Sequence, residues 1–182
     1  MKGVKACAIA FLLLTSGCAI NLPASYSPSI LLEGKGSVKV EKFDYIIDKN
    51  NREPNQKNTK HGLDSMYYSE NIDIFVSNAL KKELKFIGYS LNGPTDKIIT
   101  GEITEFMCDY VGLKNVDYLV RIKFIIKNNE GTQPNILYSK IHEGTEQTNK
   151  WQMSAGMETG IQKSLSKAIE SFIKDAQSEK LL

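Results

Sequence analysis

The sequence feature that most constrains the fold is a strict alternation of apolar and polar residues near the middle of the chain. Apolar side chains occupy every second position at Val116, Tyr118, Val120, Ile122, Phe124 and Ile126. The positions between them include Asp117, Arg121, Lys123 and Lys127. Because successive side chains of a strand point to opposite faces, this pattern predicts a strand with one buried face and one exposed face. Such half-exposed strands are typical of antiparallel sheets.

The flanking segments predict further strands. Residues 97–110 (KIITGEITEFMCDY) are rich in Ile, Thr and aromatic residues and predict the preceding strand. Residues 128–131 (NNEG) have turn chemistry, so residues 136–148 are expected to pair back as the second arm of a hairpin. Residues 37–47 (SVKVEKFDYII) alternate at first and predict an earlier strand that becomes two-sided towards its end.

Two segments have helical periodicity. The first is expected to run from Ser69, a candidate N-cap, to Ile87, with Gly88 as its stop. Its apolar face contains Ile72, Phe75, Val76, Ala79, Leu80, Leu84 and Ile87. Its other side contains mainly Lys81, Lys82, Glu83 and Lys85, which predicts a solvated face. The second helix, residues 154–177, has an apolar stripe of Met157, Ile161, Leu165, Ala168, Ile169, Phe172, Ile173 and Ala176.

The order of these elements is strand, helix, strand, strand, strand, helix. That order predicts an α+β fold in which two helices pack on one face of a mainly antiparallel sheet. The chain has 182 residues, which favours one folded domain. Its 23 basic and 21 acidic residues are interspersed, and such a charge balance argues against nucleic acid as a partner.

The N-terminus has the organisation of a targeting signal. Lys2 and Lys5 precede an apolar run, residues 6–14, that is too short to span a bilayer. The run ends in Leu14-Thr15-Ser16-Gly17-Cys18, which resembles the lipobox of bacterial lipoproteins. The alternatives are a chance cysteine after an ordinary secretory signal, or an apolar N-terminal helix of a cytosolic protein.

The lipobox resemblance implies cleavage before Cys18 and attachment of a diacylglyceryl group to its thiol. We therefore expect a signal peptide over residues 1–17, a lipidated tether over residues 18–36 and a single periplasmic domain over residues 37–182. Two or three acyl chains make such an anchor long-lived. Ala19 stands where an enterobacterial inner-membrane retention signal has aspartate, so the resemblance points to the outer membrane.

Residues 48–65 contain almost no apolar side chain, and we expect a long mobile loop. Loops of this length are often functional, and a solvated insertion is the equally weighted alternative. Asn55, Gln56 and His61 of this loop are the candidate partner-binding residues, together with Trp151. Trp151, just before the last helix, is either a hydrophobic staple of that helix or a partner anchor.

The sequence offers little that points to catalysis. It has two histidines, His61 and His142, without the spacing of a metal site, and we expect neither a metal nor a cofactor. A small envelope hydrolase is the weakest of the alternatives because no nucleophile elbow is present. Cys108 is the one cysteine expected in the mature domain, and its neighbours Phe106 and Met107 favour a buried thiol over intermolecular pairing.

The segments VKVEKFDY, FVSNALKKELKFIGYSL and ITGEITEF, with the lipobox, the hairpin and the last helix, resemble YajG-like and related auxiliary lipoproteins of envelope machines. The resemblance implies a non-enzymatic accessory domain tethered to the outer membrane, with a protein partner in the envelope that serves transport, secretion or surface-polymer export. The alternative is a carrier that shelters a lipid or glycan between helices and sheet. A carrier needs an apolar cavity, whereas an interaction protein needs an exposed patch or edge and a filled core.

Overall fold

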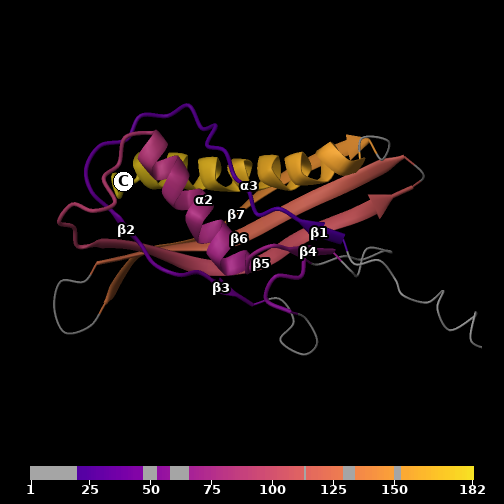
Figure 1. The fold of residues 1–182 in the computed structure, drawn as a ribbon. Coiled ribbons are helices and arrows are strands. Elements are labelled where there is room, and N and C mark those ends of the chain that lie inside the picture. Colours follow the sequence, from indigo (N-terminus) through magenta and orange to yellow (C-terminus); the bar gives the residue numbers. More distant parts are fainter. Residues whose placement is uncertain (1–19, 47–52, 58–65, 113, 129–133, 150–152) are drawn as a thin grey trace, which may run out of the picture.

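The structure, a computed structural model, describes residues 20–46, 53–57, 66–112, 114–128, 134–149 and 153–182. The elements in chain order are β1 (Ile20–Leu22), β2 (Lys39–Val40), β3 (Asp44–Tyr45), β4 (Met66–Tyr68), α2 (Ile72–Phe86), β5 (Lys97–Val111), β6 (Asn115–Asn128), β7 (Asn135–Asn149) and α3 (Met153–Ser178). Both helices lie on one face of a long sheet (Figure 1). The predicted α+β class is confirmed, with a mixed sheet that is mostly antiparallel.

The main sheet has the order β2-β5-β6-β7, and β3 also pairs with β5. The predicted antiparallel hairpin is confirmed, because β6 pairs with β7 along nearly its whole length. The strand predicted before it, β5, pairs antiparallel with β6, so that the three strands form a meander. The first strand differs from the prediction, because residues 37–47 form two short strands that run parallel to β5. Phe43 lies between them, fully buried, and its N–H donates to Ser77 Oγ of α2. The inward Phe43 explains why the alternation fades there.

A second, two-stranded sheet pairs β1 with β4 in parallel. The sequence did not predict it, because three residues are too few to show a period. The pairing joins Ile20 to Met66 and Leu22 to Tyr68, so a segment near the N-terminus becomes part of the folded domain.

The apolar faces predicted for the two helices are confirmed, since the described members of both stripes are buried. The start of α2 differs, because Asn71 precedes the helix and makes no capping bond with its side chain. Ser69, the predicted cap, instead accepts the N–H of Ala24. Gly88 follows α2 with a φ of 113°, which suits a glycine stop. Across the described ranges, no helix combines the length and apolar composition that crossing a bilayer requires.

The core lies between the helices and the sheet and is filled with aromatic rings. Phe124 of β6 stacks on Phe172 of α3 with ring centroids 4.2 Å apart, and Phe43 packs edge-on against Phe124 at 5.7 Å. Towards β4, Phe75 stacks on Tyr68 at 5.6 Å. At Gly144 of β7 the chain passes so close to α3 that a Cβ would overlap the Ser164 carbonyl oxygen. These contacts hold α3 directly on the sheet.

Residues 20–36, called the strap below, correct the expectation of a tether. Leu22, Tyr26 and Ile30 of the strap are buried in the core. Glu83 of α2 anchors the strap: it accepts hydrogen bonds from the Tyr26 hydroxyl at 2.6 Å and from the N–H groups of Ser29 and Ile30 at 3.0 and 3.2 Å. Glu83 is therefore fully buried, and its placement on a solvated face was wrong. The folded domain therefore includes residues 20–36, because the strap supplies part of its core.

The middle of the expected mobile loop also belongs to the fold. Residues 53–57 lie against β4, where Asn55 and Tyr68 exchange hydrogen bonds and Pro54 accepts the N–H of Ile72. Lys57 is only 2% exposed. The remainder of the predicted loop, 48–52 and 58–65, lies outside the described residues.

Candidate functional site

The structure does not bring the four predicted partner-binding residues together. Asn55 donates its side-chain amide to the Tyr68 carbonyl at 2.9 Å, and the Gln56 carbonyl accepts the Tyr45 hydroxyl at 3.0 Å. These bonds hold the 53–57 segment to the domain. His61 and Trp151 lie outside the described residues, as does the predicted lipidation site Cys18.

The face of the sheet opposite the helices, called the open face below, carries crossing ion pairs. Arg121 of β6 lies between Glu105 of β5, at 2.5 Å, and Glu143 of β7, at 3.0 Å. Lys123 of β6 pairs with Glu102 of β5 at 3.3 Å. Exposed pairs of this kind contribute little to stability. They keep most of the open face polar and satisfy its charges internally.

The outer edge of β7 differs from the rest of the open face. No strand of the described chain pairs with this edge. Ile136, Leu137 and Ile141 of β7 are 62%, 37% and 59% exposed, and we call them the edge patch. An unpaired strand edge next to exposed apolar side chains is a surface on which another chain can add.

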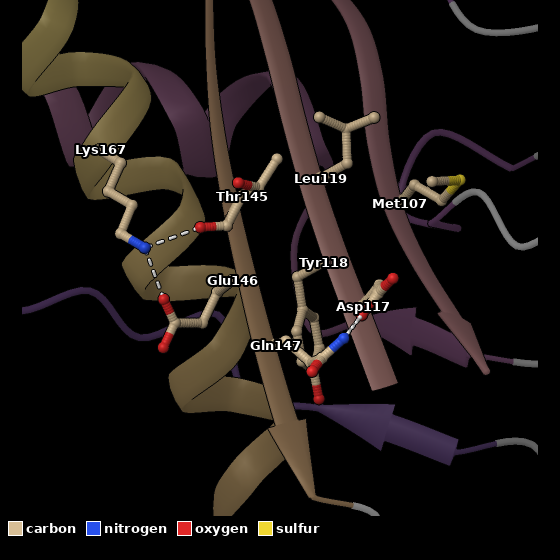
Figure 2. A pocket seen from close by; sticks show the side chains of 8 residues that line it. All are labelled: Met107, Asp117, Tyr118, Leu119, Thr145, Glu146, Gln147 and Lys167. Atoms are coloured by element: carbon tan, nitrogen blue, oxygen red, sulfur yellow. Dashed lines mark hydrogen bonds and ion pairs between the residues drawn. The ribbon is translucent and has the colours of Figure 1, made fainter. Parts of the chain in front are cut away.

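A surface hollow of about 560 Å³ lies at the other end of β7 (Figure 2). Its lining comes from β5, β6, β7 and α3. Lys167 of α3 donates to Glu146 at 2.6 Å and to the Thr145 carbonyl at 2.7 Å. Gln147 donates to Asp117 at 2.7 Å. Because these polar groups are paired with each other, the hollow offers a ligand few groups for recognition.

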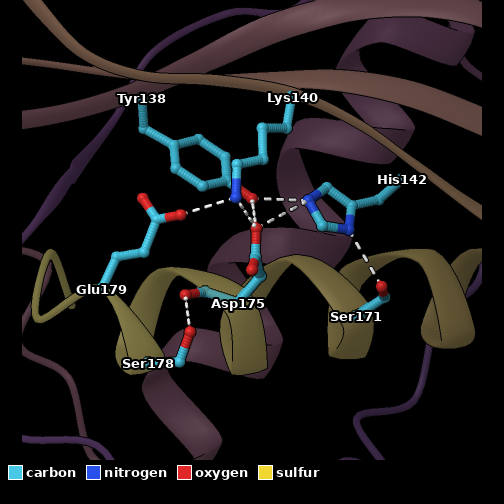
Figure 3. A network of polar contacts seen from close by, with 7 residues as sticks. All are labelled: Tyr138, Lys140, His142, Ser171, Asp175, Ser178 and Glu179. Atoms are coloured by element: carbon cyan, nitrogen blue, oxygen red, sulfur yellow. Dashed lines mark hydrogen bonds and ion pairs between the residues drawn. The ribbon is translucent and has the colours of Figure 1, made fainter.

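A chain of polar contacts joins β7 to α3 (Figure 3). The Tyr138 hydroxyl donates to Asp175 Oδ2 at 2.7 Å and lies 2.5 Å from His142 Nε2. Ser171 Oγ lies 2.9 Å from His142 Nδ1. Lys140 binds both Asp175, at 2.8 Å, and Glu179, at 2.5 Å. We call these six residues the Tyr138 network.

The Tyr138 network contains the residue types of a hydrolytic triad in an arrangement that suits packing better than catalysis. Since Tyr138 gives its proton to Asp175, its oxygen accepts from Nε2–H, and Nδ1 is left to accept from Ser171. Ser171 lies inside α3, where the backbone N–H groups bond within the helix and cannot form an oxyanion hole. The network therefore fastens α3 to β7.

The charge states in the Tyr138 network follow from burial and from Lys140. Burial lowers the pKa of His142 below its usual value, which keeps the imidazole neutral near pH 7. Hydrogen bonds from Lys140 and then Tyr138 lower the pKa of Asp175. Burial, followed by the bond to Asp175, raises the pKa of the Tyr138 hydroxyl.

We expect mild acidification to lower the free energy of unfolding of the domain, because His142 is held neutral in the network. The unfolded chain has the ordinary histidine pKa of about 6.5, so below this pH it binds more protons than the folded chain, and stability falls with pH down to the lower folded pKa. Urea unfolding of the wild type and of His142→Gln at pH 7.5 and 5.5 measures this. The advantage of the wild type should shrink at pH 5.5, and an equal advantage at both pH values would contradict the assignment.

The 53–57 segment contributes a buried charged side chain, Lys57. The Lys57 ammonium lies close to the thiol of Cys108, and both residues are buried. The predicted burial of Cys108 is thus confirmed, and burial raises the pKa of its thiol. Burial lowers the pKa of Lys57. Nearby, the hydroxyl of the buried Tyr68 has no hydrogen-bond partner among the described residues.

Burying Lys57 costs stability, so we expect Lys57→Met to raise the free energy of unfolding by about 1–2 kcal/mol at pH 7. The lysine pKa is lowered on folding, so the cost grows as the pH falls below the unfolded value of 10.5. Urea unfolding at pH 7 and pH 10 checks this, and the gain should shrink at pH 10. Lys114→Met, at an exposed position, is the control and should change stability by less than about 0.5 kcal/mol.

Comparison with known proteins places the fold among bacterial proteins. No family model matches the sequence, and no curated protein matches it. The solved structure of protein XCC0632 from Xanthomonas campestris, described with the family model DUF330, has a TM-score of 0.66 at 10% identity, over 89% of this chain and 99% of that chain. The hypothetical protein CT253 from Chlamydia trachomatis has a TM-score of 0.55 at 10% identity, over 80% and 97%. These likenesses establish a shared fold.

Sequence reasoning missed the Tyr138 network, although the pattern that builds it is present. Tyr138, Lys140 and His142 alternate along β7 and so share one face. Ser171 and Asp175 lie four residues apart in α3, and Glu179 follows at the same spacing directly after the helix. The two sets could have been matched only if α3 had been placed over β7 rather than over the other strands.

Proposed function

We propose that this chain is a lipid-anchored, non-enzymatic lipoprotein that supports a protein assembly of the bacterial cell envelope. Its anchor is the diacylglyceryl group on Cys18, and its domain faces the periplasm from the outer membrane. The edge patch of Ile136, Leu137 and Ile141 is the observation that carries the proposal. The resemblance of the sequence pattern to YajG-like lipoproteins supports the accessory role.

The filled core favours an interaction protein over a carrier. The space between the helices and the sheet is occupied by Phe43, Phe75, Phe106, Phe124 and Phe172, each at most 1% exposed. A carrier would keep an apolar cavity there for its ligand. The edge patch of β7 offers a partner apolar surface on the outside of the domain.

The arrangement of the Tyr138 network favours the non-enzymatic role that we propose. Its hydroxyl, imidazole and carboxylate groups satisfy one another between β7 and α3. Catalytic groups need a face left open for substrate and donors aimed at the developing charge. Here the polar groups are used to join two elements of the fold.

Cys18→Ala tests the anchor. Because the thiol accepts the diacylglyceryl group, the variant should incorporate no fatty acid and should be released from the membrane or stall before processing. Metabolic labelling with a fatty-acid analogue measures incorporation, and Cys108→Ala is the matched control that should still be labelled. Label that survives in Cys18→Ala would contradict the lipoprotein assignment.

Site-specific photo-crosslinking in whole cells tests the partner. A photoreactive amino acid replaces Ile141 of the edge patch or, as the control, Lys174 on the exposed side of α3. We expect an envelope protein to be captured from position 141 and not from position 174. Equal capture at both positions would reject the edge patch, and a lipid that co-purifies and is seen by native mass spectrometry would favour the carrier.

A further inference from the structure

Ile20, which is part of the folded domain, is very close in the chain to the proposed lipid anchor. Cys18 is two residues before Ile20, where β1 starts and pairs with Met66 of β4. Two residues of fully extended chain span at most about 7 Å. The strap that follows is held by its buried side chains and by Glu83, so it cannot lengthen this connection without unpacking. A short anchor of this kind fixes which end of the domain faces the bilayer.

Two contacts show which end that is. The Tyr68 ring of β4, next to β1, packs edge-on against Phe106 of β5 with centroids 5.6 Å apart. Ser25 of the strap hydrogen-bonds to Glu158, near the start of α3. Phe106 lies in the half of β5 next to the β5–β6 turn, where it pairs with Val120. β1 and the start of α3 lie towards that end of the sheet, and the C-terminus lies at the opposite end (Figure 1).

The β5–β6 turn at this end has the chemistry of a membrane interface. Val111 is 44% exposed, and Lys114 across the turn is also exposed. Gly112, between them, has a φ of 64°. An exposed apolar side chain beside a lysine suits the headgroup region, where the apolar group enters and the ammonium contacts anionic lipid.

We propose that the β5–β6 turn rests on the headgroups of the same membrane that holds the acyl chains, so that the domain stands on its β1–β4 end. This inference rests on the proposed lipidation of Cys18. The strands of the meander then run away from the membrane. At about 3.3 Å per residue, the 15 residues of β5 carry the opposite end of the sheet roughly 50 Å along the strand axis. Ile136 and Leu137 of the edge patch lie at the far end of β7 and Ile141 lies near its middle, so the patch is presented to partners at a distance from the bilayer.

Fluorescence quenching in vesicles tests the orientation. The full lipidated protein, with Cys108→Ala to leave one labelling site, carries an environment-sensitive dye at Val111→Cys or at Asn92→Cys, an exposed position in the turn before β5. Each is reconstituted into vesicles of phosphatidylethanolamine and phosphatidylglycerol that contain a headgroup-nitroxide lipid. We expect the nitroxide to quench the dye at position 111 several-fold more strongly than the dye at position 92.

A variant with a longer linker tests whether the short connection to the anchor is what orients the domain. A Gly/Ser insertion of about 20 residues between Cys18 and Ile20, with a mean reach of about 25 Å, should keep attachment and abolish the difference between the two positions. Equal quenching at both positions in attached protein without the insertion would overturn the orientation while leaving lipidation intact. Protein that carries no acyl chain and does not bind the vesicles would overturn the proposed function and this inference together.

Discussion

Replacing Phe124 with alanine is expected to lower the free energy of unfolding by about 3–5 kcal/mol. Phe124 is fully buried, and it joins three parts of the fold through its ring. It stacks on Phe172 of α3 at 4.2 Å, packs against Phe43 between β2 and β3, and contacts His142 of β7 at 6.0 Å. The expected loss of stability has two parts. The buried apolar surface of the ring is lost, and a cavity remains because the surrounding elements cannot all move inward to fill it.

Urea denaturation of the domain from Ile20 onward measures this effect. Lys123→Ala, one residue earlier on the open face, is the matched control because its ion pair with Glu102 is about one-third exposed. The control should change stability by less than about 0.5 kcal/mol. Similar losses from the two substitutions would mean that the faces of β6 have been assigned the wrong way round.

Sequence reasoning succeeded where a period is long enough to be counted. Ten or more residues of β6 and of both helices repeat at their characteristic spacing, so their buried faces could be predicted one residue at a time. The strap has no such period. Its Leu22, Tyr26 and Ile30 are four residues apart but lie in a chain with two prolines and no helix, so their burial follows from tertiary contacts alone.

Charged residues were the other source of error. Glu83 was predicted to lie on a solvated helix face and Lys57 fell within the predicted mobile loop, because isolated charges are rarely buried. Each is buried beside a partner that is distant in the sequence. Glu83 accepts hydrogen bonds from Tyr26, Ser29 and Ile30 of the strap, more than 50 positions earlier, and Lys57 lies close to Cys108. Local composition contains no sign of such pairs. Of the candidate site, the sequence could predict the exposed face of the sheet, and the lipid anchor stays a prediction because Cys18 lies outside the described residues. The edge patch could not be predicted, because it depends on β7 having no outer neighbour among the described strands.

Glu83→Ala is expected to destabilise the domain by about 3–5 kcal/mol, because it removes the acceptor of three hydrogen bonds in a buried place. The Tyr26 hydroxyl and the N–H groups of Ser29 and Ile30 would then be unsatisfied in the core, or the strap would detach and expose its apolar side chains. Either response weakens the same contacts. Lys85→Ala, on the exposed side of α2, is the control and should have little effect.

Glu83→Gln distinguishes loss of the acceptor from loss of the charge. Oε1 accepts both the Tyr26 hydroxyl and the Ser29 N–H, and a glutamine carbonyl can take that place. Oε2, which accepts the Ile30 N–H, becomes an amide donor that faces another donor. We therefore expect a loss between those of wild type and Glu83→Ala. Limited proteolysis should cut within residues 20–36 fastest in Glu83→Ala, since strap release exposes that backbone. Cleavage there at the wild-type rate would show that the buried apolar side chains hold the strap without Glu83, and that the short connection between anchor and domain does not depend on this carboxylate.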